Sequence, residues 1–202
     1  MYGIFLDSET TGLHPVKHAI IDIAFKIIDL TTGHCKTEYH SVVKQPQSVW
    51  DQKDIHSIAI NQFSWEEIQQ GLPAKVVAEN IIDRFNAIPI NRDNAVFICQ
   101  NPSFDRGFFI QLVDTYRQEE LNWPYHWLDL ASMFWAAQVA ASQREGTPIP
   151  DSIRFSKNAI ARTYHIPPEN DRHRSMNGVN HLIACYKAVL NLNWTHNKEE
   201  TL

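Results

Sequence analysis

The chain has 202 residues, which is the length of one domain with a substantial buried core. Hydrophobic residues make up 44% and charged residues 20% of the sequence, as is ordinary for a soluble globular protein. The formal net charge of −5 excludes a protein that coats long duplex DNA through phosphate contacts alone, because such binding needs a surplus of basic residues. The negative net charge is still compatible with an enzyme in which metal ions supply the positive charge at the reaction centre. We expect a single domain over residues 1–202, with a core that ends near residue 192 and a short polar tail.

The cysteines and the first residues indicate a compartment. Cys35, Cys99 and Cys185 are scattered and include no CxxC pair, which favours a reducing environment and argues against a zinc ribbon. The segment Met1–Asp7 has no basic start and no long apolar stretch, so we expect no signal peptide. No window approaches the roughly 18 apolar residues of a membrane helix. The sequence therefore predicts a cytoplasmic protein.

The first three predicted elements are strands. Ile4–Leu6 is predicted to be a buried strand that ends at Asp7, and the isoleucine-rich run Ile20–Ile28 is predicted to be the second. A turn at Gly33 then leads into a third strand around Cys35–Val43, whose more polar, alternating residues suit a sheet edge.

Helices alternate with strands in the rest of the chain. Ser64 and Glu67 match a capping box, and Pro73 is suited to start a second helix. Three apolar residues of that helix recur at four-residue spacing on one face: Val77, Ile81 and Phe85. The remaining expected elements are a strand at Ala95–Cys99, a helix from about Phe104 to Tyr116, a strand at Trp127–Leu128 leading into a helix at Asp129, and a helix over Val179–Leu190. This order indicates an α/β domain with a mixed sheet.

Two carboxylates stand at the end of the first strand. Alternate residues of a strand share a face, so Asp7 and Glu9 project together. Clustered carboxylates repel one another unless a cation lies between them, and hard ions such as Mg²⁺ or Mn²⁺ prefer oxygen ligands. A solvated pair on an exposed strand end is the alternative.

The segment from Asp7 to Leu13 resembles the first motif of the DEDD exonucleases, the family of ribonuclease T and of the proofreading subunit of bacterial replicative polymerases. Asn101 to Phe109, which follows a predicted strand, is similar to the second motif and places Asp105 in the first turn of a helix. An aspartate at a helix start is also favoured by the helix dipole, so a purely local role is the alternative. His173 begins a segment similar to the third motif of the histidine (DEDDh) branch.

Weaker similarities occur in the family's order: Ile20–Ala24, Ile55–Ile58, Leu128–Ala131 and Lys157–Ala161. The resemblance therefore spans the chain from Gly3 to about Leu190. It implies a ribonuclease-H-like fold, in which helices flank a mixed five-stranded sheet.

The resemblance also implies a site with two Mg²⁺ or Mn²⁺ ions. Asp7 would bridge both ions, Glu9 would bind one, and Asp105 would act through a bound water. His173 would take a proton from the attacking water, since imidazole titrates near neutral pH. Five positions are implied to contact the substrate: Thr10, Gly12, Leu13, Asn101 and Phe104. Leu13, Phe104 and Phe108 are candidates for stacking on bases, with core packing as the alternative for the two phenylalanines.

The third motif departs from the family's pattern. The family's last metal-binding aspartate lies five residues after the histidine, and the residue five after His173 is Gly178. Activity could survive with water or Asn180 in the gap, or His181 could bind a softer ion such as Mn²⁺, or catalysis could be lost. Asn177 offers only a neutral amide. We further expect that Gly178→Asp fits the helix and raises activity, unless the glycine has a positive φ.

The sequence thus favours a metal-dependent 3′→5′ exonuclease that releases nucleoside monophosphates from DNA or RNA. The alternative is a catalytically impaired module that binds nucleic-acid ends or a replication or repair partner. A ribonuclease-H-like endonuclease leaves Asn101–Phe109 and His173 unexplained. The expected partner is a nucleic acid with a single-stranded 3′ end or short overhang. Because ribonuclease T-like proteins dimerise, a homodimer is also considered.

Overall fold

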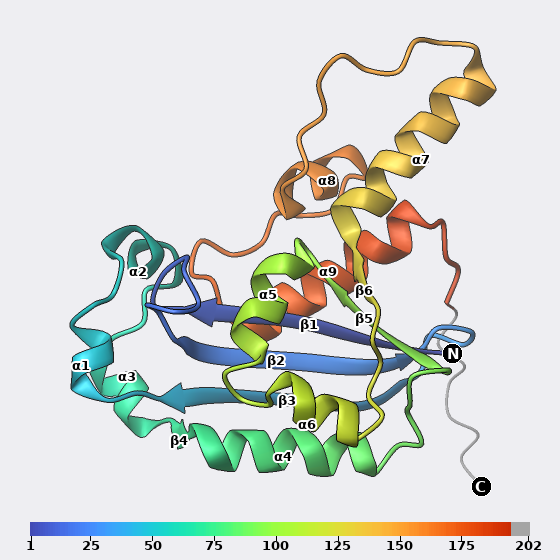
Figure 1. Ribbon diagram of the computed structural model, residues 1–202. Coiled ribbons are helices and arrows are strands. Elements are labelled where there is room, and N and C mark those ends of the chain that lie inside the picture. Colours follow the sequence, from blue (N-terminus) through green and yellow to red (C-terminus); the bar gives the residue numbers. More distant parts are fainter. Residues whose placement is uncertain (195–202) are drawn as a thin grey trace, which may run out of the picture.

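A mixed six-stranded sheet forms the centre of the computed structural model, which describes residues 1–194 (Figure 1). Its strands are β1 (Tyr2–Thr10), β2 (Ile20–Asp29), β3 (Cys35–Lys44), β4 (Leu72–Pro73), β5 (Ala95–Cys99) and β6 (Trp127–Asp129), in the order β4-β3-β2-β1-β5-β6. The first three strands pair antiparallel, and β1, β5 and β6 pair parallel. The five predicted strands are all present, and the two-residue β4 adds a sixth parallel to β3. Residues 195–202, in the predicted polar tail, lie outside the described part.

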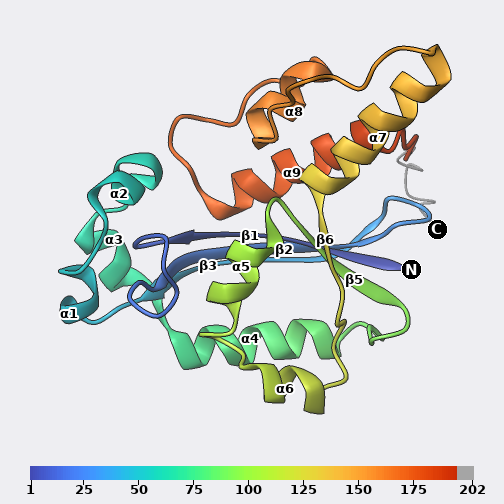
Figure 2. The same ribbon diagram turned by 45° about the horizontal axis from the view of Figure 1, so that its top comes forward.

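Helices cover both faces of the sheet, as Figure 2 shows. One face carries α4 (Ala74–Asn86) and α6 (Thr115–Glu120), and the other carries α7 (Leu130–Glu145), α8 (Lys157–Thr163) and α9 (Ser175–Val189). The short helices α1 (Gln47–Trp50), α2 (Ile55–Asn61) and α3 (Trp65–Gln70) lie together at one end of the sheet, and α5 (Pro102–Phe109) follows β5. None of the helices described combines the length and apolar character that a membrane crossing requires.

Strand alternation divides the core into two layers. Ile4 and Leu6 of β1 belong to the cluster under α4, whereas Phe5 packs with residues of α7, α8 and α9. Asp7 and Glu9 share the face of Phe5, because successive side chains of a strand point to opposite sides. The two candidate carboxylates therefore project from β1 towards the layer that contains α9.

Local signals predicted the starts of α3, α4 and α7, but not all helix starts or lengths, and α9 begins at Ser175 before the predicted Val179. The capping box of Ser64 and Glu67 is present at the start of α3, and Val77, Ile81 and Phe85 are all buried on one face of α4. The single helix predicted from Phe104 to Tyr116 is wrong. It is divided into α5 and α6, because the Asp114 side chain accepts backbone hydrogen bonds and starts a new helix. β1 also runs past Asp7 to Thr10, since it continues to pair with β2 there.

Candidate active site

The first carboxylates of the site lie near the C-terminal end of β1. Asp7 is 9% exposed and Glu9 is half-buried, and both extend beyond the part of β1 that pairs with β5. The pairing register with β2 shifts between Glu9 and Thr10, so the regular strand ends directly after the second carboxylate. The strand thus holds both side chains on a rigid element.

Asp105 reaches the same place from α5. Asn101 adopts a left-handed conformation (φ 59°) that turns the chain sharply after β5, and Pro102 occupies the first helical position. Asp105 is 3% exposed, and its Oδ1 accepts a hydrogen bond of 2.8 Å from the Ser8 hydroxyl on β1. The Ser8 bond holds α5 against the end of β1, and the Asp7 charge acts on Asp105 there.

The three carboxylates influence one another electrostatically. Burial, and then the nearby Asp7 charge, raise the pKa of Glu9 to about 9 and that of Asp105 to about 8. Burial also raises the pKa of Asp7, against an opposing effect of Lys157. The raised pKa values reflect burial and too little positive charge near these carboxyls, and a bound cation would favour their ionised forms.

Lys157, at the start of α8, is a member of the site that sequence reasoning missed. Its Nζ lies 2.9 Å from Oδ1 of Asp7 and 3.2 Å from Oε2 of Glu169, and all three side chains are largely buried. Glu169, from the segment between α8 and α9, adds a fourth carboxylate, whose Oε1 has no hydrogen-bond partner among the described residues. The similarity at Lys157–Ala161 marked Lys157 only as part of a helix, and no motif included Glu169, because their contacts join distant segments.

Gly178 lies in α9 directly opposite Asp7. A Cβ added to Gly178 would overlap the Asp7 carboxylate and would lie 2.9 Å from Nζ of Lys157. Position 178 therefore faces the carboxylates, and an aspartate fits there only if the Asp7 carboxylate and the Lys157 ammonium move, a requirement that the sequence did not reveal.

The neighbours of Gly178 do not fill the gap. Asn180 lines a different hollow together with Lys26 and Trp194, and Asn177 is exposed. His181 is buried with its Nε2 3.0 Å from the Pro167 carbonyl oxygen and its Nδ1 3.9 Å from Glu169. The hypothesis that Asn180 supplies a ligand is thus wrong, and His181 supports the Glu169 segment.

His173 is half-buried close enough to Asp7 for its charge to lower the pKa of that carboxyl. The segment that carries it is anchored on both sides. Arg172 and Arg174 contact Oε1 of Glu67 at 2.5 and 3.0 Å, and the Arg174 guanidinium lies 3.6 Å from the centre of the Phe63 ring. This anchoring was not predicted, although Glu67 was recognised as a capping residue.

A buried aspartate on β2 sets the position of α9. Asp22 pairs with Glu9 in the β1–β2 register and is fully buried. Its Oδ2 accepts the Ser175 backbone N–H at 2.9 Å, and its Oδ1 lies 2.7 Å from Nε2 of His40. The sequence held one signal of this role: Asp22 lies inside the apolar run Ile20–Ala24, and a buried carboxylate needs hydrogen-bond or charge partners.

The predicted substrate residues divide into exposed and structural ones. Leu13 is 74% exposed in the β1–β2 loop, whereas the buried Thr10 hydroxyl donates to the Gly12 carbonyl oxygen at 2.7 Å. Phe104 is half-buried, with its ring centre 4.9 Å from that of Phe108. Phe108 itself is fully buried, so its proposed stacking on bases is wrong and core packing holds.

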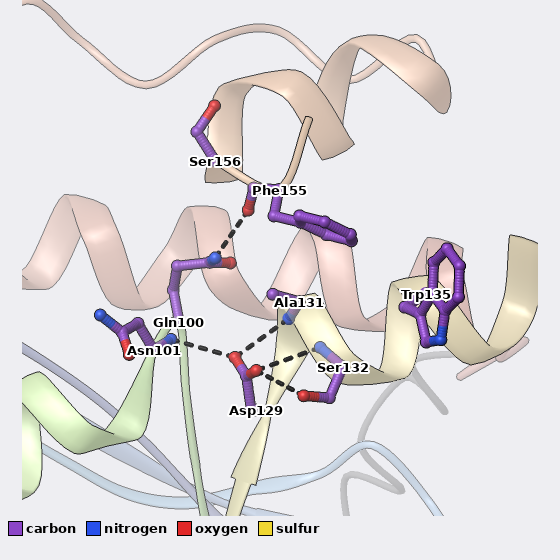
Figure 3. A pocket seen from close by; sticks show the side chains of 8 residues that line it. All are labelled: Gln100, Asn101, Asp129, Ala131, Ser132, Trp135, Phe155 and Ser156. Carbon is purple, nitrogen blue, oxygen red and sulfur yellow. Dashed lines mark hydrogen bonds between the residues drawn. The ribbon is translucent and has the colours of Figure 1, made fainter. Parts of the chain in front are cut away.

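Asn101 lines a pocket of about 560 Å³ at the C-terminal ends of β5 and β6 (Figure 3). Two aromatic rings border the pocket: Trp135 of α7, 42% exposed, and Phe155, 40% exposed. The Gln100 amide donates to the Phe155 carbonyl oxygen at 2.7 Å, and Asp129 accepts the Asn101 N–H at 3.1 Å (Figure 3). One wall residue of the pocket, Ser156, directly precedes Lys157, whose ammonium contacts Asp7.

The side chains of the site suit a hard cation on the side of Glu9 and Asp105, but not on the side of Gly178. Asp7, Glu9 and Asp105 offer the carboxylate oxygens that Mg²⁺ or Mn²⁺ prefers. As these side chains stand, no three acidic, histidine or cysteine residues within residues 1–194 form a ready metal cluster. On the Gly178 side there is no ligand atom, and an ammonium is already present.

The fold is shared with known nucleases. No protein-family model and no curated protein matches the sequence. A zinc-bound complex of E. coli exonuclease I with single-stranded DNA matches with a TM-score of 0.74 and 19% identity, over 94% of this chain and 40% of that chain. Cell-death related nuclease 4 (CRN-4) matches with a TM-score of 0.68 and 14% identity, over 94% of this chain and 64% of that chain. The chain thus spans less than half the length of exonuclease I, and the predicted ribonuclease-H-like fold is confirmed.

Proposed function

We propose that the chain is a metal-dependent 3′→5′ exonuclease that hydrolyses terminal phosphodiester bonds of DNA or RNA and releases nucleoside monophosphates. One observation carries the proposal. The buried Asp7 and Asp105 and the half-buried Glu9 form a group with too little positive charge, and His173 lies within electrostatic reach of Asp7. A metal-dependent phosphodiesterase needs such a group, whereas a folded domain gains no stability from it.

The side chains have separable roles in this reaction. When bound, a divalent cation supplies Lewis-acid polarisation of the phosphate and a lower pKa for the attacking water. The carboxylates of Asp7, Glu9 and Asp105 would hold this cation. His173 takes the proton from the attacking water, and the anchoring of its segment to Glu67 keeps the imidazole in place.

The substrate contacts follow from exposure. Leu13 projects from the β1–β2 loop next to α2, because Asp54 donates its N–H to the Thr11 carbonyl oxygen at 2.7 Å. An exposed leucine there suits the terminal base. The pocket bordered by Trp135 and Phe155 suits a base further along the strand, since every base can stack on an aromatic ring.

The test uses purified protein and 5′-labelled single-stranded DNA and RNA, with Mg²⁺, Mn²⁺ or a chelator. We expect progressive shortening from the 3′ end, release of nucleoside monophosphates, and no reaction in chelator or with Asp7→Asn. A matched substrate with a blocked 3′ hydroxyl distinguishes 3′→5′ hydrolysis from internal cleavage. Equal cleavage by wild type and Asp7→Asn would place the activity in another site or another protein.

A second function, binding of nucleic-acid ends without hydrolysis, is favoured by the Lys157 ammonium beside Asp7 and by Gly178, which supplies no ligand. It predicts that the labelled strands bind in chelator and are not shortened with any ion. The same experiment therefore separates the two functions.

A further inference from the structure

The carboxylates of the site are of two kinds. Asp7 and Glu169 are bridged by the Lys157 ammonium, at 2.9 and 3.2 Å. Glu9 and Asp105 form no ion pair within the described residues, and the hydrogen bond that Asp105 accepts from the Ser8 hydroxyl brings no positive charge. A carboxylate that is already paired with an ammonium has little further need of a cation, whereas an unpaired carboxylate can still bind one.

From this division we propose that the Lys157 ammonium takes the place of one of the two metal ions that such a site would otherwise hold. The site then binds a single divalent ion, which Asp7 shares with Glu9 and Asp105. The inference rests on the proposed function, because it concerns the metal chemistry of the same site.

The position of the ammonium supports the substitution. Nζ of Lys157 lies 2.9 Å from the point where a side chain on Gly178 would begin, so the ammonium fills the space between Asp7 and α9. A metal ion at this point would need a ligand from position 178, and glycine has none. Lysine thus provides the positive charge, and Glu169 provides the second carboxylate that it contacts.

Displacement of the ammonium by a second metal ion is unfavourable. The Glu169 side chain is 2% exposed and its other oxygen already has no partner within the described residues, so loss of Lys157 would leave a buried charge unpaired. A second divalent ion on the Gly178 side would be repelled by the retained ammonium, because Nζ of Lys157 already fills the space between Asp7 and α9. Both routes exclude a second ion.

One ion remains favourable on the other side of Asp7. Glu9 and Asp105 bring two further carboxylates that have no ion-pair partner among the described residues, whereas the ammonium contacts only Asp7 and Glu169. The site is therefore built for one ammonium and one divalent ion.

The test counts ions directly. Mn²⁺ is titrated into the chelator-treated full chain, and bound ions are counted from the loss of the electron paramagnetic resonance signal of free Mn²⁺. We expect one ion per chain, with affinity strongly reduced in Glu9→Gln. Two ions in the wild type would overturn the inference and leave the proposed function intact. No bound ion would overturn both.

A triple variant tests whether Lys157 is the cause. Lys157→Met with Glu169→Gln removes one positive and one negative charge together, and Gly178→Asp adds the missing ligand once the Asp7 carboxylate, released from Lys157, can turn away from position 178. We expect this variant to bind two Mn²⁺ ions. A single ion in a folded triple variant would show that Lys157 does not exclude the second, and would overturn the inference.

Lys26→Met is the matched control. Lys26 contacts Glu38 at 2.9 Å on the neighbouring strands, so the variant removes a lysine ion pair away from the site. We expect its ion count to equal that of the wild type. Should the triple variant not fold, the wild-type count and the Glu9→Gln titration decide the inference alone.

Discussion

Asp7 faces Gly178 across the contact between β1 and α9, and its carboxylate fills the space that a side chain at position 178 needs. Gly178→Asp alone should therefore destabilise the protein, although aspartate is the residue of the family motif. Overpacking costs about 1–3 kcal/mol, and an added buried carboxylate increases the loss. We expect the free energy of unfolding, measured in urea without metal, to fall by more than about 2 kcal/mol.

Two alanine variants isolate the steric part of this effect. Gly178→Ala adds only a methyl group and should still destabilise. Gly107→Ala is its control, because the nearest atom to a Cβ there is Cγ of Pro15 at 3.4 Å, an ordinary contact. Equal stability of the two variants would mean that Asp7 and Lys157 move aside at little cost.

Glu9 should give the metal-free protein a pH-dependent stability. Burial and the Asp7 charge raise its pKa to about 9, whereas glutamate in an unfolded chain titrates near about 4.3. The folded state therefore binds more protons between these values, and the free energy of unfolding falls as the pH rises through this window. Asp105, with its pKa raised to about 8, acts in the same direction.

Urea unfolding at a series of pH values in chelator checks the Glu9 prediction. Glu9→Gln should show a shallower fall in stability with pH than the wild type, while Glu66→Gln, an exposed control, should show the same fall. A slope unchanged in Glu9→Gln would contradict the raised pKa. Added Mn²⁺ should restore stability to the wild type at high pH, because it binds only the folded state.

The fold could be predicted where the signal lies within a few residues. The spacing of Val77, Ile81 and Phe85 specifies one helix face, and Ser64 with Glu67 specifies a helix start, so both predictions are confirmed. The division at Asp114 was missed, because an aspartate within an apolar-periodic run has no distinctive sign from sequence alone.

The site shows the same limit. Strand alternation was enough to place Asp7 and Glu9 on one face, since both lie in one strand. The Lys157–Asp7 pair joins residues 150 positions apart, and a lysine at a helix start is ordinary. Tertiary packing alone brings its ammonium to the carboxylates, and for that reason neither Lys157 nor the crowding at Gly178 could be derived from the motif.

Arg174 should act as a positioning residue for His173. Arg174 contacts Glu67 at 3.0 Å and also donates to the Asn61 carbonyl oxygen, so Arg174→Met leaves both acceptors without this donor. We expect a loss of about 1–3 kcal/mol in the free energy of unfolding. In the exonuclease assay, kcat should fall by about tenfold or more with little change in KM, because a misplaced base slows chemistry rather than binding.

Arg92→Met is the control for Arg174. Arg92 contacts Glu119 at 2.8 Å in an exposed ion pair, and such pairs contribute about 0–1 kcal/mol. Its kcat and stability should stay near those of the wild type. If Arg174→Met retains full kcat, the imidazole does not depend on this anchor.

Trp135 should contribute to the binding of strands that reach beyond the terminal nucleotide. Its ring borders the pocket next to Asn101, with the ring centre 6.4 Å from that of Phe155. Base–aromatic stacking contributes about 1–3 kcal/mol, so Trp135→Ala should weaken binding of a single-stranded oligonucleotide about 5- to 150-fold. Binding is measured by fluorescence anisotropy in the Asp7→Asn background, which prevents hydrolysis.

Tyr116→Ala is the matched control, because Tyr116 is 83% exposed on α6, which covers the opposite face of the sheet. A mononucleotide should bind both variants equally, since it does not extend to the pocket. Equal affinity of the two variants for the long strand would show that nucleic acid does not use this pocket.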